Sequence, residues 1–199
     1  MNHSPKEYLS FFKEIESLKT VQRQNQTMDG RYENAAEHSW QLAIMAPLLQ
    51  SFFQDDVNLE TVMLMLLIHD IGEIGAGDTS VFDEEGKATS YQRELFSVQQ
   101  TLGYLPDASR SNLLALWKEF ETGTSPEARY ARVIDAFAPL MNHYFIAQDN
   151  DNPDDLTKQQ VLAKKAFIEQ ESPDIWQLVL ELVAKSVDKG LYSDDDSES

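Results

Sequence analysis

The stretch LLIHDIGEIGAGD, residues 66–78, begins as an apolar helix and ends in a Gly-Ala-Gly bend, and between these parts it places His69 beside Asp70. A buried aspartate without a partner loses its hydration and destabilises the fold, so Asp70 requires a cation or a hydrogen-bond network. Adjacent residues on a helix point about 100° apart, so the two side chains can meet only at a group beside the helix. A metal ion fits that geometry.

The same pattern, a polar residue inside an apolar helical segment, occurs at two other places. His38 lies in the first turn of AEHSWQLAIMA, and Asp135 lies within ARVIDAFAPLM. Taken singly, each such residue is more often a hydrogen-bonded core residue than a ligand. Together, His38, His69, Asp70 and Asp135 form a mixed nitrogen and oxygen set from three helices, which suits Mn, Fe, Co, Ni, Zn or Mg. The chain has no cysteine, which excludes disulfides and thiolate metal sites.

Helical patterns dominate the rest of the chain, and strand patterns are almost absent. Ser4-Pro5, Ser125-Pro126 and Ser172-Pro173 are each typical of an N-cap followed by proline at the first helical position. Apolar positions recur at spacings of three and four in residues 5–19, 36–53, 59–70, 90–102, 107–121, 126–147, 155–169 and 173–189. We therefore predict an all-α fold, a single bundle of about eight helices with a metal site between helices.

Length and composition limit the classes of protein that fit. A chain of 199 residues with 42% apolar residues is long enough for one large domain, which we place at 1–190, followed by an acidic tail at 191–199. The formal charge of -18 would repel a nucleic-acid polymer, so we expect no such partner. No apolar stretch approaches the roughly 18 residues of a membrane span. We expect a soluble, cytoplasmic protein.

The order of these residues resembles a known family. His38, then His69-Asp70, then Asp135 is similar to the H…HD…D signature of the HD-domain metal-dependent phosphohydrolases. The longer motifs RYENAAEHSW, HDIGEIGAGD and LWKEFETGTSPEARYARVIDAF resemble the branch that contains the 5'-deoxynucleotidases and the HD-domain-containing protein 2 type. A lone HD dipeptide is weak evidence, whereas three extended motifs in order are specific.

The resemblance implies roles for six acids and histidines. It implies that His38, His69, Asp70 and Asp135 bind a divalent metal ion. For Glu73 and Asp78 it implies water activation, protonation of the leaving group or ligation of a second ion. The residues agree with an active role, because Glu73 follows Asp70 by three positions and Asp78 follows a bend that can fold it over the site.

Hydrolysis of a phosphate ester also requires positive charge near the phosphoryl oxygens. Arg23, fifteen residues before His38, matches the arginine that contacts the substrate phosphate in the deoxynucleotidases. Arg31, just before the EHSW motif, is a second candidate for substrate binding. The family pattern has tryptophan after the first arginine, but this chain has Gln24, and this departure leaves the preference for deoxyribose open.

Other polar and aromatic residues are interpreted as structural. Glu119, Glu121 and Glu127 lie near helix ends and are assigned no catalytic role. His143 is expected at a surface or subunit contact beyond Pro139. The three tryptophans, Trp40, Trp117 and Trp176, are expected in the core.

The leading function implied by the resemblance is release of phosphate from a small nucleotide, most of all a 5'-(deoxy)nucleoside monophosphate. Two alternatives remain open at this point. The same metal and water could hydrolyse a nucleoside di- or triphosphate or an alarmone, or the chain could be a binding module with little turnover. Glu73 and Asp78 favour an enzyme, because a binding module would not need them. The family resemblance also suggests a homodimer.

Overall fold

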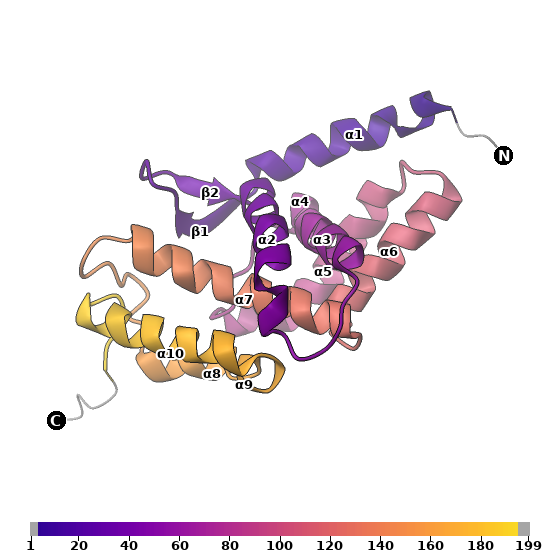
Figure 1. The fold of residues 1–199 in the computed structure, drawn as a ribbon. Helices are drawn as coiled ribbons and strands as arrows, with labels where there is room; N and C mark the ends of the chain where they lie inside the picture. Colours follow the sequence, from indigo (N-terminus) through magenta and orange to yellow (C-terminus); the bar gives the residue numbers. More distant parts are fainter. Residues whose placement is uncertain (1–3, 195–199) are drawn as a thin grey trace.

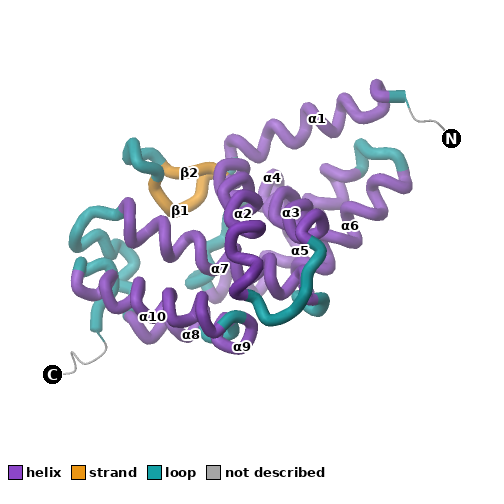
Figure 2. The backbone as a smooth tube through the Cα atoms, viewed as in Figure 1, coloured by secondary structure: helices purple, strands orange, loops and turns teal. Residues whose placement is uncertain are grey.

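The structure, a computed structural model, describes residues 4–194 and consists mainly of helices (Figures 1 and 2). The α-helices are α1 Leu9–Ile15, α2 Ala35–Leu49, α3 Leu59–Ile68, α4 Glu73–Ala76, α5 Glu84–Leu102, α6 Asp107–Thr122, α7 Pro126–Ile146, α8 Lys158–Lys165, α9 Ile168–Glu171 and α10 Pro173–Asp188. The 3-10 helices are η1 Pro5–Tyr8, η2 Glu16–Thr20, η3 Gln50–Phe52 and η4 His69–Gly72. Within residues 4–194, no helix is both long and apolar enough to cross a membrane. The helical fold agrees with the prediction.

The predicted helix starts are confirmed at all three serine-proline pairs. The side chains of Ser4, Ser125 and Ser172 each accept a hydrogen bond from a backbone N–H in the first turn of η1, α7 and α10. Gly190 follows α10 with a φ of +72°, a left-handed conformation that glycine adopts without strain. Local capping chemistry therefore fixes these boundaries.

A small antiparallel sheet was not predicted. Strand β1, Gln22–Gln26, pairs with β2, Tyr32–Asn34, and Gly30 in the turn between them has a φ of +82°. The sequence QRQNQ of β1 lacks the alternation of apolar and polar residues that indicates a half-buried strand. The strand is instead held by its partner and by α7, because the Asn25 side chain donates to the carbonyl of Pro139 at 3.0 Å.

The core follows the central helices. Leu42 of α2, Met65 of α3 and Ile134 of α7 are fully or almost fully buried in one apolar cluster. A second cluster joins α7 to α8 and α10 and includes Val161 and Val179. Figure 1 shows α8, α9 and α10 on one side of the molecule and α1 and α6 on the other, with α2 and α3 between them. Helix α7 thus contributes to both clusters, and it carries Asp135.

Two of the three tryptophans lie in the core, and one does not. Trp117 and Trp176 are buried, but Trp40 is 63% exposed, so its predicted burial is wrong. Trp40 shares the outer face of α2 with Ile44 and Leu48, which are also exposed. Because α2 is apolar around most of its circumference, its pattern identifies a helix but does not show which face is buried.

The chain remains packed beyond the predicted end of the domain at residue 190. Leu191 and Tyr192 are buried, and Ser193 pairs with Thr157 at the start of α8. The remainder of the predicted acidic tail, residues 195–199, lies outside the described residues.

Candidate metal centre

His69 and Asp70 begin the 3-10 helix η4, directly after α3, whereas the predicted helix over residues 59–70 had them as its last two residues. Nδ1 of His69 is 2.8 Å from the carbonyl oxygen of Leu66, and since a carbonyl can only accept, Nδ1 carries the proton. Nε2 is left as the ligand atom, and it lies 3.0 Å from Oδ1 of Asp70. Gly72 allows η4 to approach α5 closely, because a Cβ there would lie 2.9 Å from the Cβ of Glu94.

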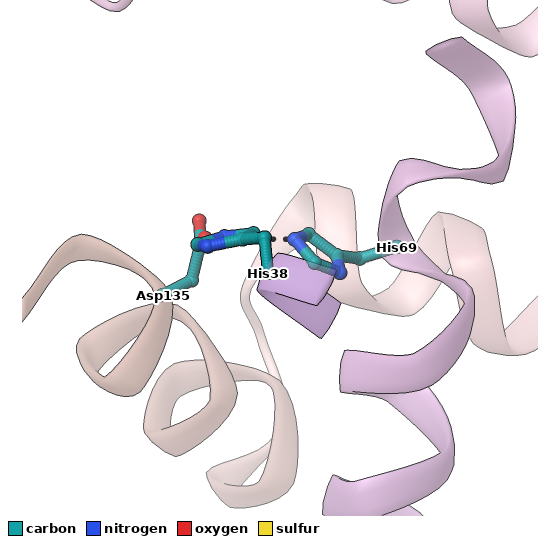
Figure 3. A group of neighbouring side chains, drawn as sticks. All are labelled: His38, His69 and Asp135. Carbon is teal, nitrogen blue, oxygen red and sulfur yellow. Dashed lines mark hydrogen bonds and ion pairs between the residues drawn. The ribbon is translucent and has the colours of Figure 1, made fainter. Parts of the chain in front are cut away.

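His38 and Asp135 complete a cluster from three segments of the chain (Figure 3). Nε2 of His38, on α2, is 2.9 Å from Oδ1 of Asp135, on α7, and Nε2 of His69 is 3.5 Å from the same oxygen. One ligand atom from each of His38, His69 and Asp135 lies within 4.8 Å of the others. The helices therefore bring two imidazoles and a carboxylate to one point, as the sequence predicted.

The electrostatics of this cluster favour a cation. Burial by itself lowers the pKa of His69, but Asp70 and Asp135 outweigh burial and raise it to about 9. Burial raises the pKa of Asp135, yet the hydrogen bond from His38 and the nearby charge of His69 hold it well below the usual range. Nε2 of His69 is buried without a hydrogen-bond partner within residues 4–194. A divalent ion fits this donor set, because it would occupy the Nε2 lone pair and supply the positive charge that the carboxylates attract.

Glu33, on β2, lies behind this cluster and was not identified from the sequence. Its Oε1 is 3.8 Å from Nδ1 of His38 and 3.5 Å from Nε of Arg23. Burial raises the pKa of Glu33, and the nearby charges of His38 and Arg23 oppose this shift. A carboxylate beside the outer nitrogen of a metal-binding histidine can orient the imidazole ring.

Arg23 lies on β1 among four carboxylates. Its NH1 is 3.0 Å from Oδ2 of Asp70, 3.8 Å from Oε1 of Glu73 and 3.6 Å from Oδ1 of Asp78, and Glu33 faces its Nε. Burial opposes the charge of Arg23, but the nearby acids Asp70, Asp78, Asp135 and Glu73 raise its pKa above the usual value. The hairpin that the sequence did not indicate therefore places the predicted arginine at the cluster.

Glu73 and Asp78 both lie beside Arg23, at the positions expected from the sequence. Burial, together with the charges of Asp70 and Asp78, raises the pKa of Glu73 to about 10, so this carboxyl group carries a proton at neutral pH. Asp78 follows Gly77, whose φ of +76° turns the chain back toward the cluster. One protonated acid and one further acid thus flank the same arginine.

These residues line one end of a cavity of about 550 Å³. Its walls include Gln24 and Asn25 of β1, Asp135 of α7 and Lys165 of α8, and it also reaches Asp70. A cavity of this size accommodates a small ligand of the dimensions of a nucleotide. The residue that follows Arg23, Gln24, therefore faces the space that such a ligand would occupy.

The second predicted arginine does not join the site. Arg31 is exposed and directs both terminal nitrogens to the carboxylate of Glu37, at 2.7 and 2.8 Å. It is absent from the walls of the cavity formed by residues 4–194. Its position in the hairpin turn, one residue before β2, explains the difference, because the side chain points along the surface instead of toward η4.

Three residues that sequence reasoning set aside or did not consider line the cavity: Glu121, His143 and Lys165. Burial and Glu94 raise the pKa of Glu121 to about 7. His143 is partly exposed, lines the cavity and has its Nδ1 3.0 Å from the hydroxyl of Tyr192, while its expected surface or subunit contact stays a prediction. The spacing of eight residues from Asp135 was the available signal for His143.

The fold and the cluster together define a helical protein with a candidate metal site between its helices. The HD domain profile matches residues 15–176, and the chain belongs to this family. It is similar to a protein named 5'-deoxynucleotidase HDDC2 from Danio rerio, with 32% identity over 129 residues, 64% of this chain and 63% of the relative. The Homo sapiens protein of the same name is 29% identical over 135 residues, 67% of this chain and 65% of the relative.

The match therefore spans less than two thirds of the length of each of these two relatives. A solved structure covers more of the chain. The crystal structure of a predicted metal-dependent phosphohydrolase from Magnetospirillum magnetotacticum MS-1 superposes with a TM-score of 0.86 and 35% identity, over 94% of both chains. This likeness extends over nearly the whole helical fold.

Proposed function

We propose that this protein is a divalent-metal-dependent phosphohydrolase that releases phosphate from nucleoside 5'-monophosphates. The observation that carries the proposal is the convergence of His38, His69 and Asp135 on one point, with Asp135 and Arg23 in the wall of a nucleotide-sized cavity. The names of the relatives support it, since two are 5'-deoxynucleotidases and the similar crystal structure is of a predicted metal-dependent phosphohydrolase.

His38, His69, Asp70 and Asp135 would hold the ion. A bound divalent ion would place positive charge next to the phosphoryl group and would lower the pKa of a bound water to about 7. Asp70 belongs in this set because its Oδ1 lies 3.0 Å from the ligand nitrogen of His69. Mn, Co, Mg, Zn, Fe and Ni all accept a mixed nitrogen and oxygen set, so the donors leave the metal open.

The chain's own residues account for substrate binding and proton transfer. Arg23 can form two parallel hydrogen bonds to phosphoryl oxygens once the ion engages the carboxylates around it. Glu73 holds a proton at neutral pH and is placed to give it to the departing alcohol oxygen of the nucleoside. Asp78, whose Oδ1 is 3.6 Å from NH1 of Arg23, can orient water or the sugar.

The test is a phosphate-release screen of chelator-treated protein with each of the six metals and a panel of nucleotides. We expect release from 5'-monophosphates with at least one metal and none without metal. If phosphate were released only from nucleoside di- or triphosphates or alarmones, the proposed substrate class would be those compounds and not the monophosphates. Binding without release from any nucleotide would favour a binding module. The homodimer suggested by the resemblance remains a prediction, which light scattering with size exclusion would test.

A further inference from the structure

Lys165, the last residue of α8, is a buried cation in the wall of the cavity. Its exposed fraction is 8%, and it is the only lysine in the buried class within residues 4–194. Its Nζ donates to the carbonyl oxygen of Ala136 at 2.6 Å, directly after Asp135. The ammonium group is therefore held next to the metal cluster by a residue far away in the sequence.

Side chains from two other elements are attached to α7 close to Pro139. Proline has no N–H, so it cannot donate to the carbonyl four residues earlier, that of Asp135, and the hydrogen-bond pattern of α7 is interrupted there. Lys165 donates to the next carbonyl, that of Ala136, and Asn25 of β1 donates to the carbonyl of Pro139. Thus α8 and β1 are both attached to α7 just after Asp135, and both contribute to the cavity walls.

The charge of Lys165 is not balanced by an acid within hydrogen-bonding distance. An ammonium group has three donors, and the described part of the chain shows one hydrogen bond from Nζ, to a neutral carbonyl. Its neighbour Lys164, in contrast, forms an ion pair with Glu84, and Arg23 faces four acids. Burial lowers the pKa of Lys165 to about 8 while Asp135 opposes this shift, so most of the group is charged at pH 7.

A buried cation without an acidic partner costs free energy, and an anion in the cavity would offset that cost. We propose that Lys165 binds the phosphate group of the substrate from the α8 wall of the cavity, while Arg23 binds it from β1. This inference rests on the proposed function, because it takes the substrate to carry a phosphate. The phosphate site would then consist of Arg23 from β1 and Lys165 from α8, with Lys165 held in place by the Ala136 carbonyl of α7.

The competing explanation is that Lys165 only fastens α8 to α7. Lys165→Gln separates the two roles, because the amide can still donate to the Ala136 carbonyl but carries no charge. Lys165→Arg keeps the charge, and Lys185→Met is the control, since it removes an exposed charge of α10 that faces Glu181 and does not line the cavity within residues 4–194.

The experiment measures binding to metal-loaded Glu73→Gln protein by calorimetry, with inorganic phosphate, AMP and adenosine as probes. For Lys165→Gln we expect at least about tenfold weaker binding of phosphate and AMP, in the range of a lost charged hydrogen bond, with adenosine unchanged. Lys165→Arg should restore phosphate binding to within about threefold, and Lys185→Met should stay within that range.

Parent-like phosphate binding by Lys165→Gln would overturn the inference. An equal loss of adenosine and phosphate binding, with a lower melting temperature, would also overturn it in favour of a fastening role. The two proposals fail separately. Phosphate release from AMP by the unmodified protein would sustain the proposed function even if Lys165→Gln bound phosphate normally. A phosphate site dependent on Lys165, without release from any nucleotide, would sustain the inference alone.

Discussion

His69 donates its Nδ1 proton to the carbonyl oxygen of Leu66, one turn earlier, over 2.8 Å. This hydrogen bond fixes both the tautomer and the direction of the ring, so that Nε2 faces Asp70 and Asp135. The backbone at the end of α3 therefore prepares the histidine for metal binding before any ion is present. A ligand oriented in this way loses less conformational entropy when the ion binds.

The first prediction is that the cluster retains about one divalent ion per chain through purification, and that Asp135→Ala reduces this to about a tenth or less. Oδ1 of Asp135 lies 2.9 Å from Nε2 of His38 and 3.5 Å from Nε2 of His69, so this substitution removes a carboxylate that contacts both imidazoles. Elemental analysis gives the metal content, and Glu181→Ala, at an exposed acid of α10, is the control. Equal metal in the parent and Asp135→Ala would show that the ion binds elsewhere.

The second prediction concerns Glu73. Replacement by Gln keeps the size of the side chain but removes the transferable proton, so phosphate release should fall by about 10²- to 10⁴-fold with the metal content unchanged. The measurement is kcat alongside elemental analysis. Parent-like turnover would remove Glu73 from the chemistry, and a loss of metal would identify it as a ligand.

The third prediction compares the two arginines that the sequence suggested for substrate binding, Arg23 by its spacing from His38 and Arg31 as a second candidate. Arg23 lies at the cluster, whereas Arg31 is paired with Glu37 at the surface. Arg23→Met should raise KM for a nucleoside monophosphate by about tenfold or more, the effect of losing a charged contact to phosphate. Arg31→Met should change KM by less than about twofold.

Steady-state kinetics on both variants provides the test, with thermal unfolding as a check, since Arg23→Met leaves Asp70 and Asp78 without their cation. A larger effect at Arg31 than at Arg23 in folded proteins would contradict the structural assignment.

The sequence predicted the metal cluster because its residues conflict with their surroundings. His69 and Asp70 end an apolar segment, and Asp135 interrupts another. A buried polar side chain requires a cation or a hydrogen-bond partner, which an apolar core does not supply. The N-caps at Ser125 and Ser172 were equally predictable, since a cap depends on neighbours within one turn.

Features that depend on distant contacts could not be predicted in this way. Strand β1 has no alternating pattern, and only pairing with β2 and contact with α7 make it a strand. Lys164 and Lys165 are identical in sequence terms, and they differ because one meets Glu84 and the other meets Ala136. Trp40 is exposed because the neighbours of α2 cover its other face.

The last prediction concerns the sugar. Gln24 follows Arg23 on β1 and lines the cavity, at the position where the deoxynucleotidase pattern has a tryptophan. Discrimination against a ribose requires a rigid wall that leaves the 2'-hydroxyl either clashing or unpaired. The Gln24 amide is flexible and can both donate and accept, so it can accommodate that hydroxyl. We therefore expect weak discrimination between ribo- and deoxyribonucleoside 5'-monophosphates.

Gln24→Trp should increase the preference for the deoxynucleotide, because an indole ring replaces the amide with a rigid apolar surface. The measurement is kcat/KM for AMP and dAMP in the parent and in Gln24→Trp. Gln22→Trp is the control, since Gln22 is an exposed residue of the same strand that does not line the cavity within residues 4–194. A preference of the parent for dAMP beyond about 100-fold, or about 2.7 kcal/mol of transition-state binding, would show that other cavity residues discriminate between ribose and deoxyribose.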